Sequence, residues 1–224
     1  MSLESSIVEV ESREGVTTRN LLLYHEPASS RLVVMLPGRN YSCDAPVLYY
    51  IRLMALEHDF DVLSLQYGFQ IVGATPNYEG IVDEATHAVA TALTRGYREV
   101  CFVGKSLGSP LALALAQSTQ VAKVSAILLT PIPAALKPTS GVRALSVVGT
   151  ADPVFHMPEC QESLQRGDME WVVLEGLDHG LRSEGNWVDS ITALKRITAE
   201  CEHFLTSSHA ASNKPLCRAD LPMV

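Results

Sequence analysis

The chain has 224 residues, 47% of them hydrophobic and 19% charged, which is enough to bury the core of one globular domain. Its formal net charge is −8 and it has no block of lysines or arginines, which argues against nucleic acid or an anionic membrane as a partner. Its five cysteines lack the spacing of a disulfide framework or a zinc site, so we expect a reduced, cytoplasmic protein without a metal.

Apolar runs at the start of the chain predict the first strands. Ile7 to Val10 and Leu21 to Tyr24 flank a turn at 13–15, and this pattern predicts an antiparallel hairpin. Leu32 to Leu36 is apolar at every position, which indicates a strand that is buried on both faces. Such a strand belongs in the centre of a sheet with helices on both sides.

The other predicted elements alternate between strands and helices. In chain order they are a helix at 46–57, a strand at 60–65, a loop at 66–69, an amphipathic helix at 77–95, a strand and a helix on either side of residue 106, strands at 124–129 and 144–149, a helix near 158–165, a strand at 170–174, and a closing helix with apolar spacing from Trp187 through Ile191 to Leu205.

This alternation predicts a three-layer α/β sandwich with a mainly parallel sheet. The connections between strands are too short for a cap domain. We therefore expect a single domain at 1–206 and a C-terminal tail at 207–224. We expect no signal peptide, and the sequence has no continuous apolar stretch that could span a membrane.

The motif Gly104-Lys105-Ser106-Leu107-Gly108 lies between a predicted buried strand and a predicted helix. In that setting a G-x-S-x-G holds the serine on a sharp turn with its Oγ exposed in a cleft. Ser106 is thus a candidate nucleophile. The same letters contain the end of a phosphate-binding loop, but that loop needs a glycine at position 99, where this chain has Glu99. Nucleotide binding is not expected.

A serine nucleophile needs a base, and the base needs an acid that orients it. Of the seven histidines, His179 follows a late strand in a glycine-flanked loop, and His156 is a weaker candidate. Asp152 follows the strand that ends at Gly149 and is the preferred acid, although it could instead be an ordinary turn residue before a proline. Asp178 is the competing acid, but adjacent loop side chains seldom face each other.

The order Ser106, Asp152, His179 is that of the α/β-hydrolase fold. From about residue 7 to 205 the chain resembles a small α/β-hydrolase without a cap, similar to dienelactone-hydrolase-like and carboxylesterase-like proteins. The resemblance rests on the G-x-S-x-G, on Gly149-Thr150-Ala151-Asp152-Pro153-Val154 and on Asp178-His179-Gly180.

The resemblance implies an oxyanion hole made by the backbone N–H of Leu107 and one N–H from the loop after an early strand. In this chain that loop offers Arg39 or Asn40. Loop residues Asn40, Tyr41 and Tyr67 are candidate substrate contacts. Lys105 is atypical for its position, and the sequence does not show whether its charge faces the pocket.

These observations predict a serine hydrolase that cleaves a small ester or thioester through an acyl-enzyme, without a cofactor. Arg39, Lys105 and Arg182 flank the motif loops and suggest a substrate with a carboxylate. The alternative is a non-catalytic protein of the same fold that binds a ligand or a partner. The expected binding partner is a small-molecule substrate. A second prediction is that the chain forms a homodimer.

Overall fold

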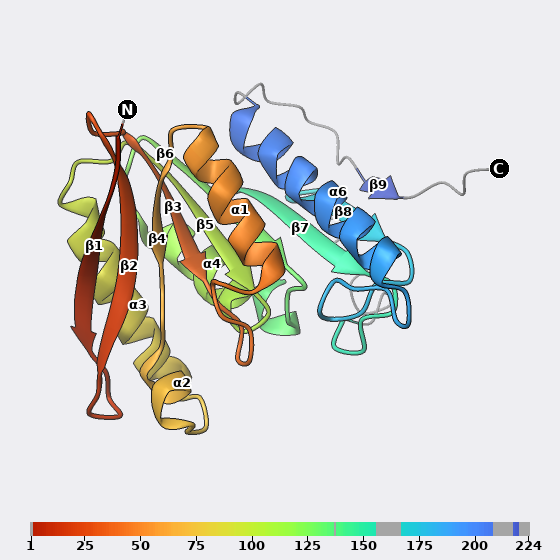
Figure 1. Ribbon diagram of the computed structural model, residues 1–224, viewed down its shortest axis with the longest axis horizontal. Coiled ribbons are helices and arrows are strands. Elements are labelled where there is room, and N and C mark those ends of the chain that lie inside the picture. The colour runs from red at the N-terminus through yellow and green to blue at the C-terminus, as the bar shows by residue number, and fades with distance from the viewer. Residues whose placement is uncertain (1, 137, 156–166, 208–216, 220–224) are drawn as a thin grey trace.

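The structure, a computed structural model, describes residues 2–136, 138–155, 167–207 and 217–219 (Figure 1). Their strands form one nine-stranded sheet in the order β1-β2-β4-β3-β5-β6-β7-β8-β9. The β1–β2 and β2–β4 pairs are antiparallel, and every other pair is parallel. The strands are β1 (Ser2–Glu11), β2 (Thr17–Glu26), β3 (Arg31–Leu36), β4 (Asp61–Ser64), β5 (Glu99–Lys105), β6 (Lys123–Leu129), β7 (Arg143–Gly149), β8 (Glu170–Leu174) and β9 (Cys217–Ala219).

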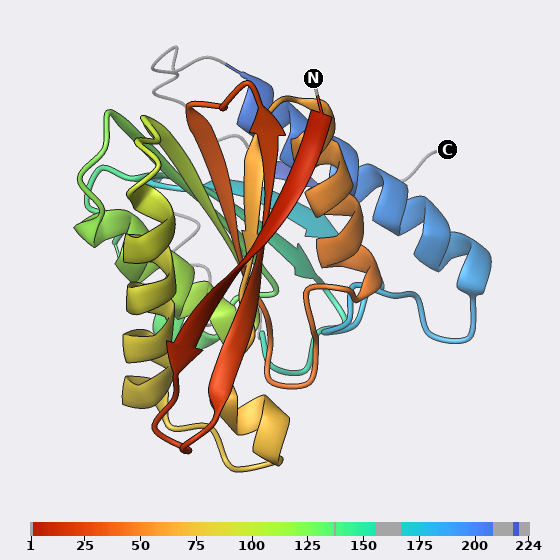
Figure 2. The ribbon, with the colours of Figure 1, turned by 60° about the vertical axis from the view of Figure 1, so that its left-hand side comes forward.

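Helices cover both faces of the sheet. They are α1 (Pro46–Glu57), α2 (Gly68–Val72), α3 (Tyr78–Leu93), α4 (Gly108–Ser118), α6 (Trp187–Thr206) and the 3-10 helix η1 (Pro133–Ala135). Figures 1 and 2 show α1 and α6 on one face and α3 and α4 on the other. The predicted three-layer sandwich with a mainly parallel sheet is confirmed. No segment of the described residues forms a separate cap domain.

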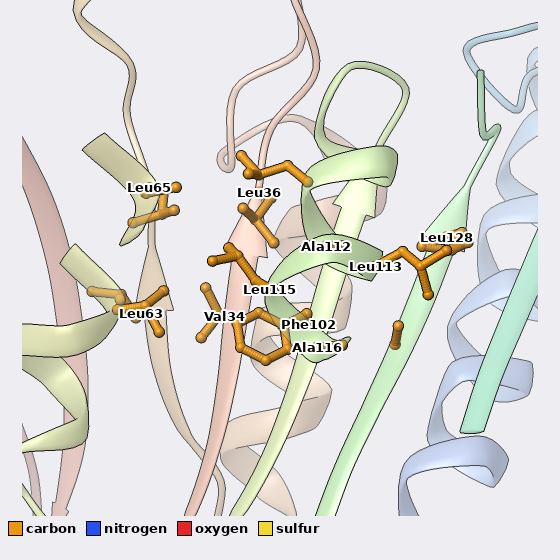
Figure 3. Close-up of a cluster of buried hydrophobic side chains, with 14 of the residues drawn as sticks. Val34, Leu36, Leu63, Leu65, Phe102, Ala112, Leu113, Leu115, Ala116 and Leu128 are labelled. Atoms are coloured by element: carbon orange, nitrogen blue, oxygen red, sulfur yellow. The ribbon is translucent and has the colours of Figure 1, made fainter. Parts of the chain in front are cut away.

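The core lies on both sides of the central strands, because alternate side chains of a strand point to opposite faces. Phe102 of β5 packs with Val34 of β3 and with Leu115 of α4 (Figure 3). Their neighbours Val33 and Val103 belong to a second cluster with α1 and α6. Burial on both faces explains why these strands read as continuous apolar runs.

Local signals set several helix ends. α1 begins at Pro46, whose fixed φ suits the first helical position. The Asn77 side chain caps α3 by accepting a hydrogen bond from the backbone N–H of Gly80. After α3 the chain leaves through Gly96, which has a φ of 86°. These ends lie within two residues of those predicted from the sequence.

One prediction of local structure is wrong. Residues 66–69 are not all loop, because Gly68 and Phe69 begin the short helix α2. The predicted closing helix is present as α6, although Trp187 and Ile191 near its start are 74% and 58% exposed. Figure 2 shows that the N-terminal end of α6 projects away from the sheet, which agrees with the exposure of these two residues.

The helix predicted near 158–165 lies outside the described residues. Of the predicted tail, β9 is described, and it pairs in parallel with β8. None of the helices in the described ranges combines the length and the apolar character that crossing a membrane requires.

Candidate active site

The turn after β5 holds Ser106 in a strained backbone conformation. Its φ of 51° lies in the left-handed region, which residues other than glycine seldom adopt. A Cβ atom on Gly104 would lie 2.8 Å from the Cβ of Ala112. One on Gly108 would lie 2.8 Å from the carbonyl oxygen of Pro37. The two glycines therefore allow β5, the turn and α4 to pack closely around the serine.

Backbone hydrogen bonds fix the position of Ser106. Its N–H donates to the carbonyl of Leu129 at 2.9 Å, which ties the turn to β6. Its carbonyl accepts from both the N–H and the Oγ of Ser109, at 2.9 and 2.6 Å. Because α4 begins at Gly108, the positive end of its dipole lies beside the serine. This location favours a negative charge next to Ser106.

His179 lies in a tight turn after β8. Leu177 and Ser183 form an isolated antiparallel bridge across the base of this turn. Within the turn, the N–H of Asp178 donates to the carbonyl of Arg182 at 2.9 Å. The imidazole of His179 is partly exposed, with 28% of its side-chain surface accessible.

Asp152 follows β7 and is 3% exposed. Its Oδ1 accepts hydrogen bonds from the N–H groups of Val154 at 2.8 Å and Phe155 at 3.3 Å. The interpretation as a turn residue is therefore correct for one carboxylate oxygen. The other oxygen, Oδ2, lies 2.7 Å from His179 Nδ1.

The structure brings Ser106, His179 and Asp152 together. His179 Nε2 lies 2.8 Å from Ser106 Oγ, so the imidazole bridges the hydroxyl and the buried carboxylate. The competing acid, Asp178, instead pairs with Arg182 at 3.2 Å. Such a chain of contacts lets a neutral imidazole accept a proton from the hydroxyl while the carboxylate fixes its tautomer.

Backbone N–H groups near Ser106 are available to a ligand. A Cβ on Gly38 would lie 3.5 Å from the Ser106 Cβ, so the loop after β3 packs against the serine turn. The N–H groups of Leu107, Arg39 and Asn40 donate to no protein acceptor within the described ranges. The hydrogen bonds therefore leave both Arg39 and Asn40 as candidates for the second donor of an oxyanion hole.

Lys105 is buried beneath this site, with 1% of its surface exposed. Its ammonium donates to the Thr130 hydroxyl and, at 2.6 Å, to the carbonyl of His179. The same nitrogen lies 5.2 Å from the centre of the Tyr41 ring, within range of a cation–π interaction. Burial lowers the pKa of Lys105 to about 8. The charge of Lys105 thus faces neither solvent nor an open pocket.

A groove of about 700 Å³ lies beside the loop after β3. Arg39, Asn40 and Tyr41 line it, together with Arg19 and Arg52. The residues that line it do not include Ser106 or His179, so it adjoins the serine site across the loop at 38–41 rather than containing it.

The candidate substrate contacts have different surroundings. Asn40 is exposed, and Tyr41 is half-buried with its hydroxyl accepting from the N–H of Val47 at 2.9 Å. The prediction for Tyr67 is wrong. Tyr67 is completely buried in the core and stacks on Phe69, with ring centres 5.9 Å apart. Tyr67 directly precedes α2, and its ring belongs to the same buried hydrophobic cluster as Phe69, so a substrate cannot reach it.

The sequence did not reveal the contacts of two residues of the site. Lys105 was noted as unusual, but its contacts depend on a turn 74 residues away in the chain. Thr130, which accepts from it, has a φ of 41° at the end of β6. A threonine just before a proline gives no sequence signal for such a contact. Among the described residues, no cluster of His, Cys, Asp and Glu could hold a metal ion.

Comparisons with known proteins identify the fold. No protein-family model and no curated protein sequence matches the chain. Among solved structures, the chain is similar to a protein of unknown function from Agrobacterium tumefaciens, with a TM-score of 0.73 and 14% identity over 94% of this chain and 100% of the other. It is also similar to the dienelactone hydrolase of Anabaena variabilis, with a TM-score of 0.70 and 17% identity over 91% and 97% of the two chains. A third similar structure is an esterase of Pyrococcus furiosus, with a TM-score of 0.68 and 15% identity over 91% of this chain and 92% of the other. The chain has the α/β-hydrolase fold.

In this α/β-hydrolase fold the candidate residues lie where parallel strands end. Ser106 follows β5, Asp152 follows β7 and His179 follows β8, while the loop with Arg39 follows β3. Ligands of open α/β sheets bind outside the carboxyl ends of the strands. The location of the site therefore agrees with the general rule for this class of sheet.

Proposed function

We propose that this protein is a serine hydrolase that cleaves a small ester or thioester through an acyl-enzyme. The observation that carries the proposal is the 2.8 Å contact between His179 Nε2 and Ser106 Oγ. A nucleophile and its base must lie within about 3.2 Å of each other for proton transfer. The similarity of the fold to a dienelactone hydrolase and an esterase supports a hydrolase.

In the first half of the reaction, Ser106 Oγ attacks the carbonyl carbon of the substrate while His179 Nε2 takes the hydroxyl proton. The N–H of Leu107 and one N–H from the loop after β3 stabilise the resulting oxyanion. Each such donor contributes about 3 kcal/mol to lowering the barrier. The intermediate then expels the alcohol or thiol, which leaves with the proton from His179.

In the second half, water attacks the acyl-enzyme and gives one proton to His179. The tetrahedral intermediate collapses, the carboxylic acid leaves, and Ser106 Oγ recovers the proton. The Asp152 carboxylate orients His179 and stabilises its imidazolium. Its 3% exposure and its two hydrogen bonds from backbone N–H groups suit it to this fixed role.

The experiment combines p-nitrophenyl acetate hydrolysis with fluorophosphonate labelling of wild type, Ser106→Ala and Ser118→Ala. Ser118 ends the same helix and is the control, because its side chain is exposed and donates a hydrogen bond to the carbonyl of Leu115. We expect wild type and Ser118→Ala to hydrolyse and to be labelled, and Ser106→Ala to do neither. A Ser106→Ala variant with wild-type rates would refute the proposal and favour the non-catalytic alternative.

The groove suggests that the substrate carries an anionic group. Arg19, Arg39 and Arg52 line it against one carboxylate, Asp44, which pairs with Arg52 at 2.9 Å. Three residues suggested an anionic substrate, and of these Arg39 lines the groove. Lys105 is buried, and Arg182 is not among the lining residues. The Arg39 side chain has no ion pair within the described part of the chain.

Replacing the Arg39 side chain separates charge recognition from catalysis, because the variant keeps its backbone N–H. For Arg39→Ala we expect KM of an ester with a carboxylate to rise about tenfold, roughly the value of one charge-assisted hydrogen bond. The kinetics of the matching neutral ester should not change. Arg98→Ala, an exposed arginine outside the groove, is the control. Equal effects of Arg39→Ala on both esters would contradict the charge assignment.

A further inference from the structure

Lys105 is an ammonium group buried between the serine turn and the histidine turn. A buried charge is costly unless it is hydrogen-bonded, and a hydrophobic side chain would fill the same space without this cost. Its three contacts are the Thr130 hydroxyl, the His179 carbonyl and the face of the Tyr41 ring. They come from three different segments of the chain, all at the carboxyl ends of the strands.

Lys105 and the next residue, Ser106, both form hydrogen bonds with His179. The Ser106 Oγ contacts the imidazole of His179 at 2.8 Å, and the Lys105 Nζ donates to the main-chain carbonyl of the same histidine at 2.6 Å. One dipeptide thus contacts both the side chain and the backbone of the base. Movement of the histidine turn away from Ser106 would have to break the bond to Lys105.

We propose that Lys105 is a positioning residue that holds the turn of His179 in register with Ser106. This inference rests on the proposed serine hydrolase function. Lys105 does not itself reach the reacting atoms, because its ammonium is directed to the backbone of His179. A misplacement of about 1 Å between a nucleophile and its base can lower a rate by about 100-fold.

The charge on Lys105 responds to its surroundings. Burial is the main cause that lowers its pKa to about 8, and Arg182 lowers it further. The carboxylates of Asp152 and Asp178 act in the opposite direction and favour the ammonium. The contacts of Lys105 with the His179 carbonyl and the Tyr41 ring also favour the charged form. Above about pH 8 the group loses its charge, and its hydrogen bond to the histidine turn weakens.

The test compares wild type, Lys105→Met and Lys123→Met across pH with a neutral ester. Lys123 is an exposed lysine at the start of β6 and is the matched control. We expect Lys105→Met to lower kcat by 10-fold to about 100-fold with little change in KM. The wild type and the control should lose activity above about pH 8, and this alkaline fall should be absent from Lys105→Met. A kcat for Lys105→Met within twofold of wild type, with the same alkaline fall, would overturn the proposal.

Thr130→Val tests the proposal without removing the lysine, should Lys105→Met fail to fold. The variant removes one acceptor from the ammonium, so the alkaline fall in kcat should move to lower pH. An unchanged alkaline fall would contradict the role of Lys105.

A spectroscopic readout separates this proposal from the proposed function. The Nδ1 proton of His179, bonded to Asp152, should give a downfield NMR signal in wild type that broadens or shifts in Lys105→Met. A wild type that neither hydrolyses esters nor reacts with the fluorophosphonate refutes the function but leaves this signal as a test of positioning. An unchanged signal in Lys105→Met refutes the positioning role whether or not the protein is a hydrolase.

Discussion

At the scale of single residues, Asp152 shows how one side chain can satisfy two interpretations of the sequence. Its Oδ1 closes a turn, and its Oδ2 holds His179. Asp152 was preferred because it follows the strand that ends at Gly149, whereas Asp178 is adjacent to His179 in the chain. The core location of Tyr67 could not be predicted in the same way, because an aromatic residue in a loop pattern gives no sign of whether it points inward.

The two aspartates also provide a matched pair of variants. Asp152→Asn keeps the shape of the side chain but can donate to His179 and favour the wrong tautomer, so we expect kcat to fall about 10⁴-fold. Asp178→Asn should change kcat little, because Asp178 contacts Arg182 and not the imidazole. Steady-state kinetics on a neutral ester measures both. Similar losses in the two variants would contradict the assignment of Asp152 as the acid.

Lys105 gives a prediction about stability and pH. Its pKa of about 8 in the folded chain lies below the ordinary value of 10.5, so between these values the unfolded chain binds more protons. The free energy of unfolding should therefore rise with pH over this window, by up to about 3 kcal/mol from this group.

The measurement is urea denaturation of wild type and Lys105→Met at several pH values from 8 to 10.5. The buried thiols of Cys43, Cys101 and Cys201 have raised pKa values and act in the opposite direction, but their contribution cancels in the difference between the two proteins. We expect the free energy of unfolding of wild type to increase relative to the variant. A difference that stays constant with pH would contradict the shifted pKa of Lys105.

At the scale of elements, the strand, turn and helix around Ser106 depend on close backbone contact. Gly108→Ala places a methyl group against the carbonyl oxygens of Leu36 and Pro37, so we expect a loss of about 3 kcal/mol or more in the free energy of unfolding. Gly80→Ala in α3 is the control, since its Cβ would lie 3.3 Å from the flexible side chain of Arg13. Helix propensity should make that variant neutral or slightly more stable. Both free energies of unfolding are measured by urea denaturation. An equal loss in Gly108→Ala and Gly80→Ala would contradict the close packing at Gly108.

The sequence predicted elements well where the pattern and the packing agree. The apolar runs at 32–36 in β3 and at 100–103 in β5 are buried on both faces of the sheet, and the ends of α1 coincide with those predicted. The apolar periodicity predicted α6 correctly, but it could not predict that Trp187 and Ile191 are exposed, because apolar spacing does not show whether a sheet lies beneath the helix. The short helix α2 was missed because five residues are too few to display a period.

At the scale of the whole molecule, the chain order of the site residues was more informative than any single motif. Because the parallel strands β5, β7 and β8 all end at one edge of the sheet, residues that follow them converge although they are far apart in sequence. The sequence could not show the tie from Lys105 to the histidine turn, which depends on how the loops fold back over the strand ends. The homodimer stays a prediction, which sedimentation velocity would test.

The central claim, that Ser106 is an acylated nucleophile, is tested most directly by intact-protein and peptide mass spectrometry. The protein is mixed with excess p-nitrophenyl acetate, quenched in acid during turnover and digested. The account predicts one acetyl group per chain on the peptide that contains Ser106, formed with a burst of p-nitrophenol and absent from Ser106→Ala. Turnover without acetylation, or acetylation that persists in Ser106→Ala, would contradict it.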